Sequence, residues 1–156
     1  MNADHRFAAS LVWTGDRGSG TSAPRAYGRD HVVSVPGKPD LHASAARVFH
    51  GDADRWNPEE QLLAALAGCH LLSYLYVAVA HGIVVVGYED AVEAVLTTTP
   101  DGGGRFTEVV LRPVVTIAEG DPELARSLHA EAHRLCFIAS SVAFPVRHEP
   151  EIRLRG

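Results

Sequence analysis

Two cysteines are the residues most able to do chemistry in this sequence of 156 residues. Cys69 lies in an almost continuous apolar stretch, residues 62–80, and Cys136 follows 67 positions later. A pair of thiols can act as one redox couple, but cysteines in apolar sequence are also common packing residues. Their spacing resembles neither the CxxC pattern of redox motifs nor that of zinc sites. The composition alone therefore leaves both interpretations open.

Composition and charge exclude several classes of protein. The formal net charge is −5, and the thirteen arginines and single lysine are scattered along the chain. A nucleic-acid binder would show a clustered basic footprint, so we expect no nucleic-acid partner. The sequence opens with no positively charged leader, and we expect a cytoplasmic protein. A lasting structural disulfide is not expected in that reducing compartment, whereas a transient catalytic one is compatible with it.

The apolar stretch at residues 62–80 carries no charge and is long enough for a membrane helix. However, His70 and Ser73 interrupt it, and no second apolar span or flanking Lys/Arg bias accompanies it. A helix that is apolar on all sides is equally typical of a protein core. We therefore predict a buried helix and no membrane partner.

The elements that must position the cysteines can be read from turn and capping residues. Asn57-Pro58-Glu59-Glu60 is a strong helix start, with a cap, a proline at the first turn and acidic residues at the positive end of the dipole. The central helix is expected over residues 57–82, with Gly82 as its left-handed stop. Asp121-Pro122-Glu123 repeats the same start and predicts a second helix to about Leu135. Segments rich in β-branched residues or flanked by turns predict strands at 7–14, 31–35, 47–49, 83–86, 89–98, 106–117 and 148–154.

This order of elements predicts a single α+β domain over residues 1–156. N-terminal strands occupy residues 1–56, the central helix 57–82, and strands, a helix and a last strand fill 83–156. Mostly antiparallel sheets should pack on the long buried central helix and the second helix.

Two motifs resemble one protein family. The stretch at residues 57–70, NPEEQLLAALAGCH, resembles the NPE(E/Q)L…AA…C signature of the OsmC/Ohr family, named for osmotically inducible protein C and organic hydroperoxide resistance protein. The segment at residues 132–137, AHRLCF, is similar to that family's second-cysteine segment. The element order fits as well. Gly68 and His70 beside the cysteine differ from the Ohr branch, so the chain looks like a divergent OsmC-like subgroup.

The resemblance implies a thiol peroxidase that reduces organic hydroperoxides and H2O2 and carries neither a cofactor nor a metal. Cys69 would be the peroxidatic residue, oxidised to a sulfenic acid, and Cys136 would resolve it as a disulfide. The reductant implied is a dithiol, such as a dihydrolipoyl protein. The preferred peroxide and the electron donor stay open.

The resemblance also implies an Arg–Glu pair that stabilises the Cys69 thiolate. Glu59 matches the glutamate of the NPE motif. Arg17 resembles the arginine of the Ohr branch, while Arg47 and Arg55 stand where the OsmC branch takes its arginine. Arg17 is our choice among the three.

Helix geometry adds an inference of its own. Glu59 and Cys69 are ten residues apart, about 15 Å along a helix and on different faces. Glu59 therefore cannot serve Cys69 of its own helix, and a shared site needs a second protomer. We predict an intertwined homodimer with active sites at its interface.

Two other kinds of protein fit the same residues. His129, His133 and Cys136 fall on one helical stripe, and with His70 they could form a His/Cys metal site. We expect instead that His129 is partly exposed and that His133 packs or lines the site. The second alternative is a non-catalytic dimer that binds an apolar small molecule in a groove lined by Leu66, Leu72, Tyr74, Tyr76, Phe137 and Phe144.

Overall fold

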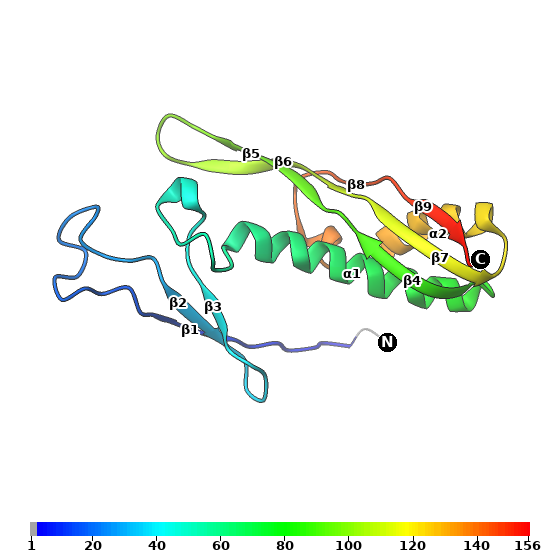
Figure 1. Ribbon diagram of the computed structural model, residues 1–156, viewed down its shortest axis with the longest axis horizontal. Helices are drawn as coiled ribbons and strands as arrows, with labels where there is room; N and C mark the ends of the chain where they lie inside the picture. The colour runs from blue at the N-terminus through cyan, green and yellow to red at the C-terminus, as the bar shows by residue number, and fades with distance from the viewer. Residues whose placement is uncertain (1–2) are drawn as a thin grey trace. The chain divides into compact units, whose positions relative to one another are not determined.

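The computed structural model describes residues 3–156 (Figure 1). The chain contacts divide it into two compact units, Met1–Gln61 and Leu62–Gly156. The expected single domain over residues 1–156 stays a prediction.

The first unit is built on a small antiparallel sheet. Its strands are β1 (Ser10–Trp13), β2 (His31–Ser34) and β3 (Leu41–Ala43), in the order β1-β2-β3. The strand expected at residues 47–49 is wrong, because Arg47–Phe49 forms a 3-10 helix, η1. His50 ends this turn in the left-handed conformation, and its N–H bonds the carbonyl of Arg47, which an extended strand could not do.

Helix α1 (Pro58–Ala80) confirms the predicted central helix. Asn57 and Glu60 form a reciprocal capping box: the Glu60 N–H donates to Asn57 Oδ1 at 2.9 Å, and the Asn57 N–H donates to Glu60 Oε2 at 3.3 Å. At the other end, Gly82 has a φ of 72°, the left-handed conformation that favours glycine. The helix is thus fixed at both ends by residues visible in the sequence.

Asn57→Ala is expected to lower the free energy of unfolding by about 1 kcal/mol, because the Glu60 N–H at the helix start loses its side-chain acceptor, Asn57 Oδ1. Denaturant unfolding followed by circular dichroism measures this loss. Asn57→Asp is the matched control, since aspartate caps as well as asparagine. An unchanged midpoint in Asn57→Ala would show that the box contributes nothing.

The second unit contains two three-stranded sheets and two helices. One sheet has the order β4-β7-β9 and the other β5-β6-β8. Helix α2 spans Pro122–Leu135 and a 3-10 turn, η2, spans Ala139–Ser141. The strands are β4 (Val84–Asp90), β5 (Glu93–Thr98), β6 (Gly104–Leu111), β7 (Pro113–Glu119), β8 (Val146–His148) and β9 (Glu151–Leu154).

The strand pairing is mixed. β4 with β7 and β5 with β6 are antiparallel, whereas β6 with β8 and β7 with β9 are parallel. Parallel neighbours need a crossover, and α2 supplies it between β7 and β8. Only Arg112 separates β6 from β7, and Glu149-Pro150 separates β8 from β9, so each of these consecutive strand pairs passes from one sheet to the other. The segment expected as a single strand at 106–117 is two strands, and the last strand, expected at 148–154, is β9, which begins at Glu151.

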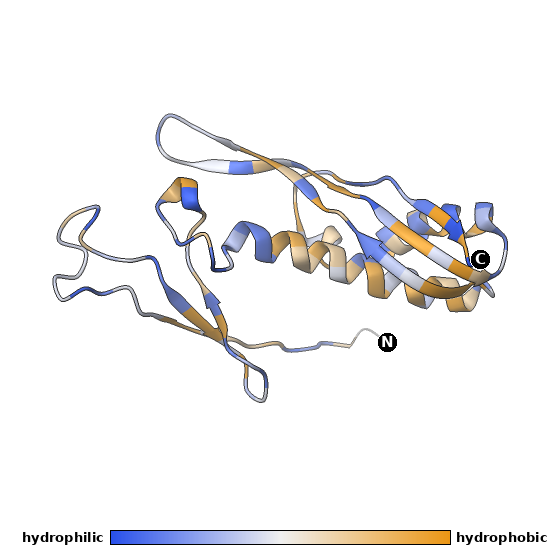
Figure 2. Ribbon diagram, viewed as in Figure 1, coloured by the Kyte–Doolittle hydropathy of each residue, from blue (hydrophilic) through white to orange (hydrophobic). Residues whose placement is uncertain are grey.

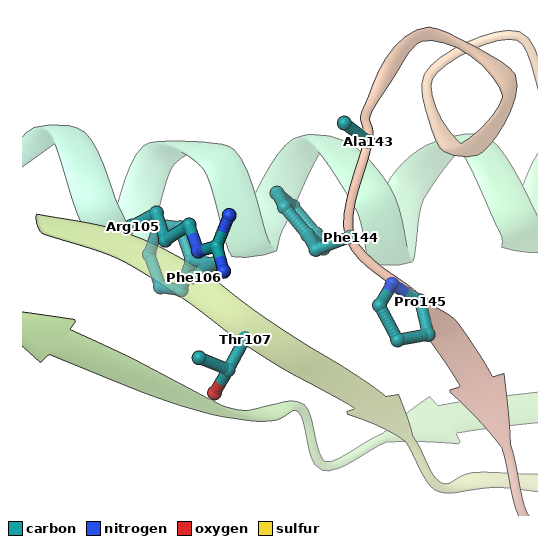
Figure 3. A pocket seen from close by; sticks show the side chains of 6 residues that line it. All are labelled: Arg105, Phe106, Thr107, Ala143, Phe144 and Pro145. Carbon is teal, nitrogen blue, oxygen red and sulfur yellow. The ribbon is translucent and has the colours of Figure 1, made fainter.

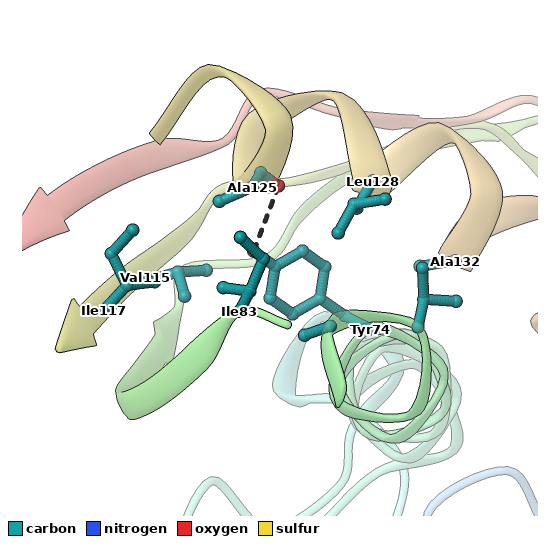
Figure 4. Packing of buried hydrophobic residues seen from close by; sticks show 9 residues of the cluster. Tyr74, Ile83, Val115, Ile117, Ala125, Leu128 and Ala132 are labelled. Carbon is teal, nitrogen blue, oxygen red and sulfur yellow. Dashed lines mark hydrogen bonds between the residues drawn. The ribbon is translucent and has the colours of Figure 1, made fainter. Parts of the chain in front are cut away.

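Helix α1 packs against both sheets of this unit. Its C-terminal half contributes Tyr74, Val77 and Ala78 to a core with β7 and α2 (Figure 4). Within that core the Tyr74 hydroxyl donates to the carbonyl of Ala125 at 3.0 Å. Nearer its start, Leu66 packs against β6 and β8. The architecture is therefore α+β with mixed and antiparallel sheets on two helices, as expected.

One face of α1 stays uncovered. Beyond its hydrophilic first turn the helix is apolar along its length (Figure 2), and Leu72, Tyr76 and Val79 are 68%, 73% and 79% exposed. By length and composition α1 could cross a membrane, but a core helix of a soluble protein passes the same test. We call this uncovered face, with Leu72, Tyr76 and Val79, the open face of α1.

Candidate functional site

The fold brings the two cysteines together. Cys69 lies in the middle of α1, and Cys136 is the residue that ends α2, where its N–H donates to the carbonyl of His133. The Cys69 side chain is close enough to shift the pKa of the Cys136 thiol, and both cysteines are free thiols. Two elements far apart in the sequence thus place one sulfur beside the other.

The two thiols differ in their surroundings. Cys136 is only 1% exposed, whereas Cys69 is partly exposed. Burial, followed by the neighbouring Cys69 side chain, raises the pKa of the Cys136 thiol to about 11. Its sulfur also accepts the N–H of Ala139 at 3.4 Å, which lowers this pKa in part. Cys136 is therefore a neutral thiol at pH 7 and a poor nucleophile.

Cys69 opens into an apolar cleft of about 570 Å³. Within the part of the chain that the structure describes, this cleft has no charged lining residue. It shares Leu72 and Tyr76 with the open face of α1. The residues that line it are Ala65, Gly68, Cys69, Leu72, Ser73, Tyr76, Leu135 and Phe137. A reagent that enters through this cleft meets a mostly apolar wall, and the cleft itself offers no cation to a Cys69 thiolate.

The groove expected from the sequence is partly correct. Leu72, Tyr76 and Phe137 line the cleft, but Leu66 and Tyr74 are fully buried in the core. Phe144 lies in a different pocket, of about 320 Å³, beside Arg105 and Phe106 on β6 (Figure 3). Phe106 and Phe144 contact each other with ring centroids 5.6 Å apart. That pocket contains neither cysteine.

The first unit contains the three candidate arginines. Arg17 lies in an exposed turn that is held by Asp16, whose Oδ1 accepts the N–H groups of Gly18 and Gly20, both at 2.9 Å. These two bonds lower the pKa of Asp16. Within residues 3–156, neither Arg17 nor Arg47 forms an ion pair, while the Nε of Arg55 lies 3.5 Å from Asp30 Oδ1. Arg55 is thus already paired with Asp30, whereas Arg17 and Arg47 are available to pair with another carboxylate.

Glu59 has an unusual environment at the start of α1. Its Oε2 is buried and has no hydrogen-bond partner among the described residues. A buried carboxylate oxygen without a partner is costly and is typically matched by a cation. Because α1 is continuous from Pro58 to Ala80, the ten-residue separation from Cys69 is a full helical separation of about 15 Å. Glu59 therefore lacks a partner and cannot reach Cys69 along its own helix.

Besides the two cysteines, the second unit contains a group of four neighbouring histidines. His70 of α1, His129 and His133 of α2 and His148 of β8 are neighbours, which we call the histidine cluster. His70 and His129 are fully buried, with ring centroids 5.3 Å apart, and His70 Nε2 lies 2.9 Å from His129 Nδ1. Tyr74 stacks on His129 at 4.0 Å. The expectation that His129 is partly exposed is wrong, because α2 turns it toward α1.

Two members of the histidine cluster, His70 and His129, are held uncharged. Burial, followed by the charges of neighbouring imidazoles, lowers the pKa of His70 to about 4 and that of His129 to about 3. Within residues 3–156, no group of three or more His, Cys, Asp or Glu side chains has a geometry that could hold a metal ion. The side-chain arrangement therefore does not support the metal alternative built on His70, His129, His133 and Cys136.

Acidification from pH 7 to 5 is expected to lower the free energy of unfolding by about 2–4 kcal/mol through His70 and His129. Their folded pKa values lie below the unfolded value near 6.5, so the unfolded chain takes up protons first as the pH falls. The stability that the fold has with neutral His70 and His129 is fully present above about pH 7 and is lost progressively as the pH falls below about 6.5. Urea unfolding at each pH measures it.

His129→Gln should reduce this pH slope, because one of the two buried imidazoles no longer titrates. His50→Gln is the matched control, since His50 is exposed. Equal slopes in His129→Gln and the wild type would contradict the assignment.

Fold and site together define a class: an α+β protein with a long helix whose mid-helix cysteine meets a buried second cysteine at an apolar cleft. A family model described as OsmC-like protein matches residues 51–151, which includes both cysteines. The chain belongs to the OsmC-like protein family.

Solved structures agree with this assignment. An OsmC-like protein of unknown function from Vibrio cholerae is 28% identical, covers 94% of this chain and 99% of its own, and has a TM-score of 0.84. An organic hydroperoxide resistance protein OsmC from Legionella pneumophila shares 21% identity over 96% of this chain and 99% of its own, with a TM-score of 0.69.

An organic hydroperoxide resistance protein from Elizabethkingia anophelis shares 17% identity over 98% of this chain and 100% of its own, also with a TM-score of 0.69. These last two likenesses establish the fold alone. No curated protein matches the chain.

Proposed function

We propose that this protein is a thiol-dependent peroxidase that reduces organic hydroperoxides. The observation that carries the proposal is the asymmetric pair of sulfurs: Cys69 opens to an apolar cleft, while Cys136 beside it is buried and neutral. The family's organic hydroperoxide resistance proteins share this fold. A peroxidatic and a resolving cysteine need this difference in access, since only one of them meets the peroxide.

The reaction takes place in three balanced steps. The Cys69 thiolate attacks the outer peroxide oxygen, the O–O bond breaks, and the alkoxide leaves with a proton as the alcohol, which gives Cys69 sulfenic acid. The Cys136 thiol then attacks this sulfur, a disulfide forms, and the hydroxyl leaves as water with the thiol proton. An external dithiol finally reduces the disulfide and is itself oxidised to a disulfide.

The apolar cleft favours bulky apolar hydroperoxides such as cumene hydroperoxide over H2O2. Apart from Cys69 and Ser73 its lining is mainly apolar, so the cleft offers more burial to a hydrocarbon group than to a small polar peroxide. H2O2 is therefore expected to be a slower substrate.

We also propose that the active protein is a homodimer whose sites combine two chains. Glu59 needs a cation and cannot reach Cys69 on its own helix. The open face of α1 exposes large apolar side chains beside the cleft, and a second α1 would cover them. Of the two available arginines, Arg17 and Arg47, we choose Arg17 as the residue that pairs with Glu59 and stabilises the Cys69 thiolate. The proposed compartment is the cytoplasm, with neither a membrane nor a nucleic acid as partner.

Mass spectrometry after one equivalent of cumene hydroperoxide tests the proposal. The expected product is a loss of two hydrogens that links the peptides of Cys69 and Cys136. Steady-state consumption of cumene hydroperoxide with dihydrolipoamide or dithiothreitol should accompany it. Oxidation of Cys69 to sulfonic acid without a link would show that Cys136 does not resolve, and unreacted protein would exclude a peroxidase.

The cleft also favours a second candidate, an apolar small-molecule carrier. A volume of about 570 Å³ with an apolar lining suits such a ligand. Fluorescence of a bound apolar dye in a Cys69→Ser variant would measure this binding without chemistry. Tight binding together with no peroxide consumption by the wild type would favour the carrier.

A further inference from the structure

The histidine cluster connects the two elements that carry the cysteines. His70 follows Cys69 directly on α1, and the carbonyl of His133 accepts the N–H of Cys136 at the end of α2. The bond between His70 and His129 joins α1 to α2, and His148 reaches both helices from β8. Any change in the distance between these helices at the cluster therefore also changes the approach of the two sulfurs.

The bond between His70 and His129 depends on the number of protons it holds. With both rings neutral, one nitrogen donates and the other accepts over 2.9 Å. The second nitrogen of each ring, His70 Nδ1 and His129 Nε2, is buried without a partner within the described part of the chain. One added proton creates a buried charge, and a second removes the acceptor and so the bond.

The surroundings offer no compensation for that charge. The groups that face the pair are Tyr74 from α1, His133 and Arg126 from α2, and His148 from β8, with Tyr88 of β4 on the far side of Tyr74. Arg126 and the imidazoles disfavour a positive charge on His129. None of these facing groups is a carboxylate. Burial, the imidazoles and Arg126 thus oppose protonation of the closed cluster, and separation of the helices with entry of water relieves this cost.

We propose that the histidine cluster is a proton-sensitive clamp that holds α1 against α2 and thereby positions Cys136 beside Cys69. The neutral cluster keeps the sulfurs together, so a Cys69 sulfenic acid is resolved at once. At low pH the clamp opens and the reaction of the sulfenic acid with Cys136 becomes slower. A second hydroperoxide molecule then oxidises the sulfenic acid to sulfinic acid and is itself reduced to the alcohol. The disulfide step of this inference rests on the proposed peroxidase function, whereas the clamp itself does not.

Histidine ring spectra of the reduced wild-type protein test the clamp without any peroxide. Long-range proton–nitrogen correlations from pH 8 to 4.5 should show one protonated and one bare nitrogen at the bonded positions of His70 and His129. A separate set of fully protonated signals should grow below pH 6 as the clamp opens. A single set that titrates smoothly near pH 6.5 in folded protein would overturn the proposal.

The partition of oxidised Cys69 tests the consequence. At pH 7.5 and 5.0, five equivalents of cumene hydroperoxide are added, and the ratio of disulfide to sulfinic acid is measured by mass spectrometry. This ratio concerns only molecules that have already reacted at Cys69. It should fall at least fivefold at pH 5.0 in the wild type, with helix content unchanged by circular dichroism. An equal ratio at both pH values would overturn the clamp.

The matched variant is the double substitution His70→Gln with His129→Asn, which keeps a polar nitrogen or oxygen near each bonded position but cannot take up a proton. Its ratio gives the change that thiol ionisation alone causes between the two pH values. The wild-type ratio should fall at least fivefold more than this, and equal falls in the two proteins would overturn the proposal. If this variant does not fold, the two wild-type measurements still decide. If Cys69 is not oxidised at either pH, the proposed function fails, and the ring spectra alone judge the clamp.

Discussion

Cys69→Ser is expected to abolish the consumption of cumene hydroperoxide with a dithiol, a loss of about 10³-fold or more. A serine hydroxyl is not ionised at pH 7, and Cys136 cannot replace the lost nucleophile. Cys136 is buried, and its pKa of about 11 keeps it a thiol. A coupled assay that follows peroxide loss at fixed dithiol concentration measures the effect.

Cys136→Ser is the informative companion. Cys69 keeps its cleft, so the first turnover should survive as a burst of one alcohol per chain. The sulfenic acid then lacks its neighbouring thiol, and excess peroxide should convert it to sulfinic acid while steady-state turnover falls. A reversed result, with Cys69→Ser active and Cys136→Ser without a burst, would exchange the two roles.

Much of the fold could be predicted from local signals. The starts of both helices are fixed by residues that act on their own first turn: Asn57 and Glu60 at α1, and Asp121, whose side chain accepts the N–H of Glu123, at α2. The pairing of the strands could not be predicted this way. A register between β7 and β9 depends on a crossover through α2, and the sequence around Arg112 looks like one continuous strand.

The candidate site shows the same division. The cysteine pair was predicted from motifs at residues 57–70 and 132–137, and the fold brings the two thiols together, although their roles stay predictions. The histidine cluster was not predicted. His129 and His133 on one stripe of α2 were visible, but the burial of His129 depends on which face of α2 meets His70, and this is set by packing with Tyr74. The face of α2 that packs against His70 cannot be predicted from a single sequence.

A mixture of Glu59→Gln and Cys69→Ser chains, refolded together, is expected to recover activity that neither variant has alone. In a mixed dimer, the Cys69 of the Glu59→Gln chain meets the intact Glu59 of the Cys69→Ser chain. Random assembly gives half mixed dimers with one working site of two, so about a quarter of wild-type activity should return. The steady-state assay with cumene hydroperoxide measures this recovery.

The control mixture is Cys69→Ser with Cys136→Ser. The two thiols are neighbours within one chain, so no mixed dimer of these variants holds a complete pair, and steady-state turnover should not return. Recovery in the first mixture and not in the second would place Glu59 and the thiol pair on different protomers. If native mass spectrometry finds mixed dimers and the first mixture stays inactive, Glu59 does not act across the interface. The unpaired buried oxygen of Glu59 would then need a cation from its own chain.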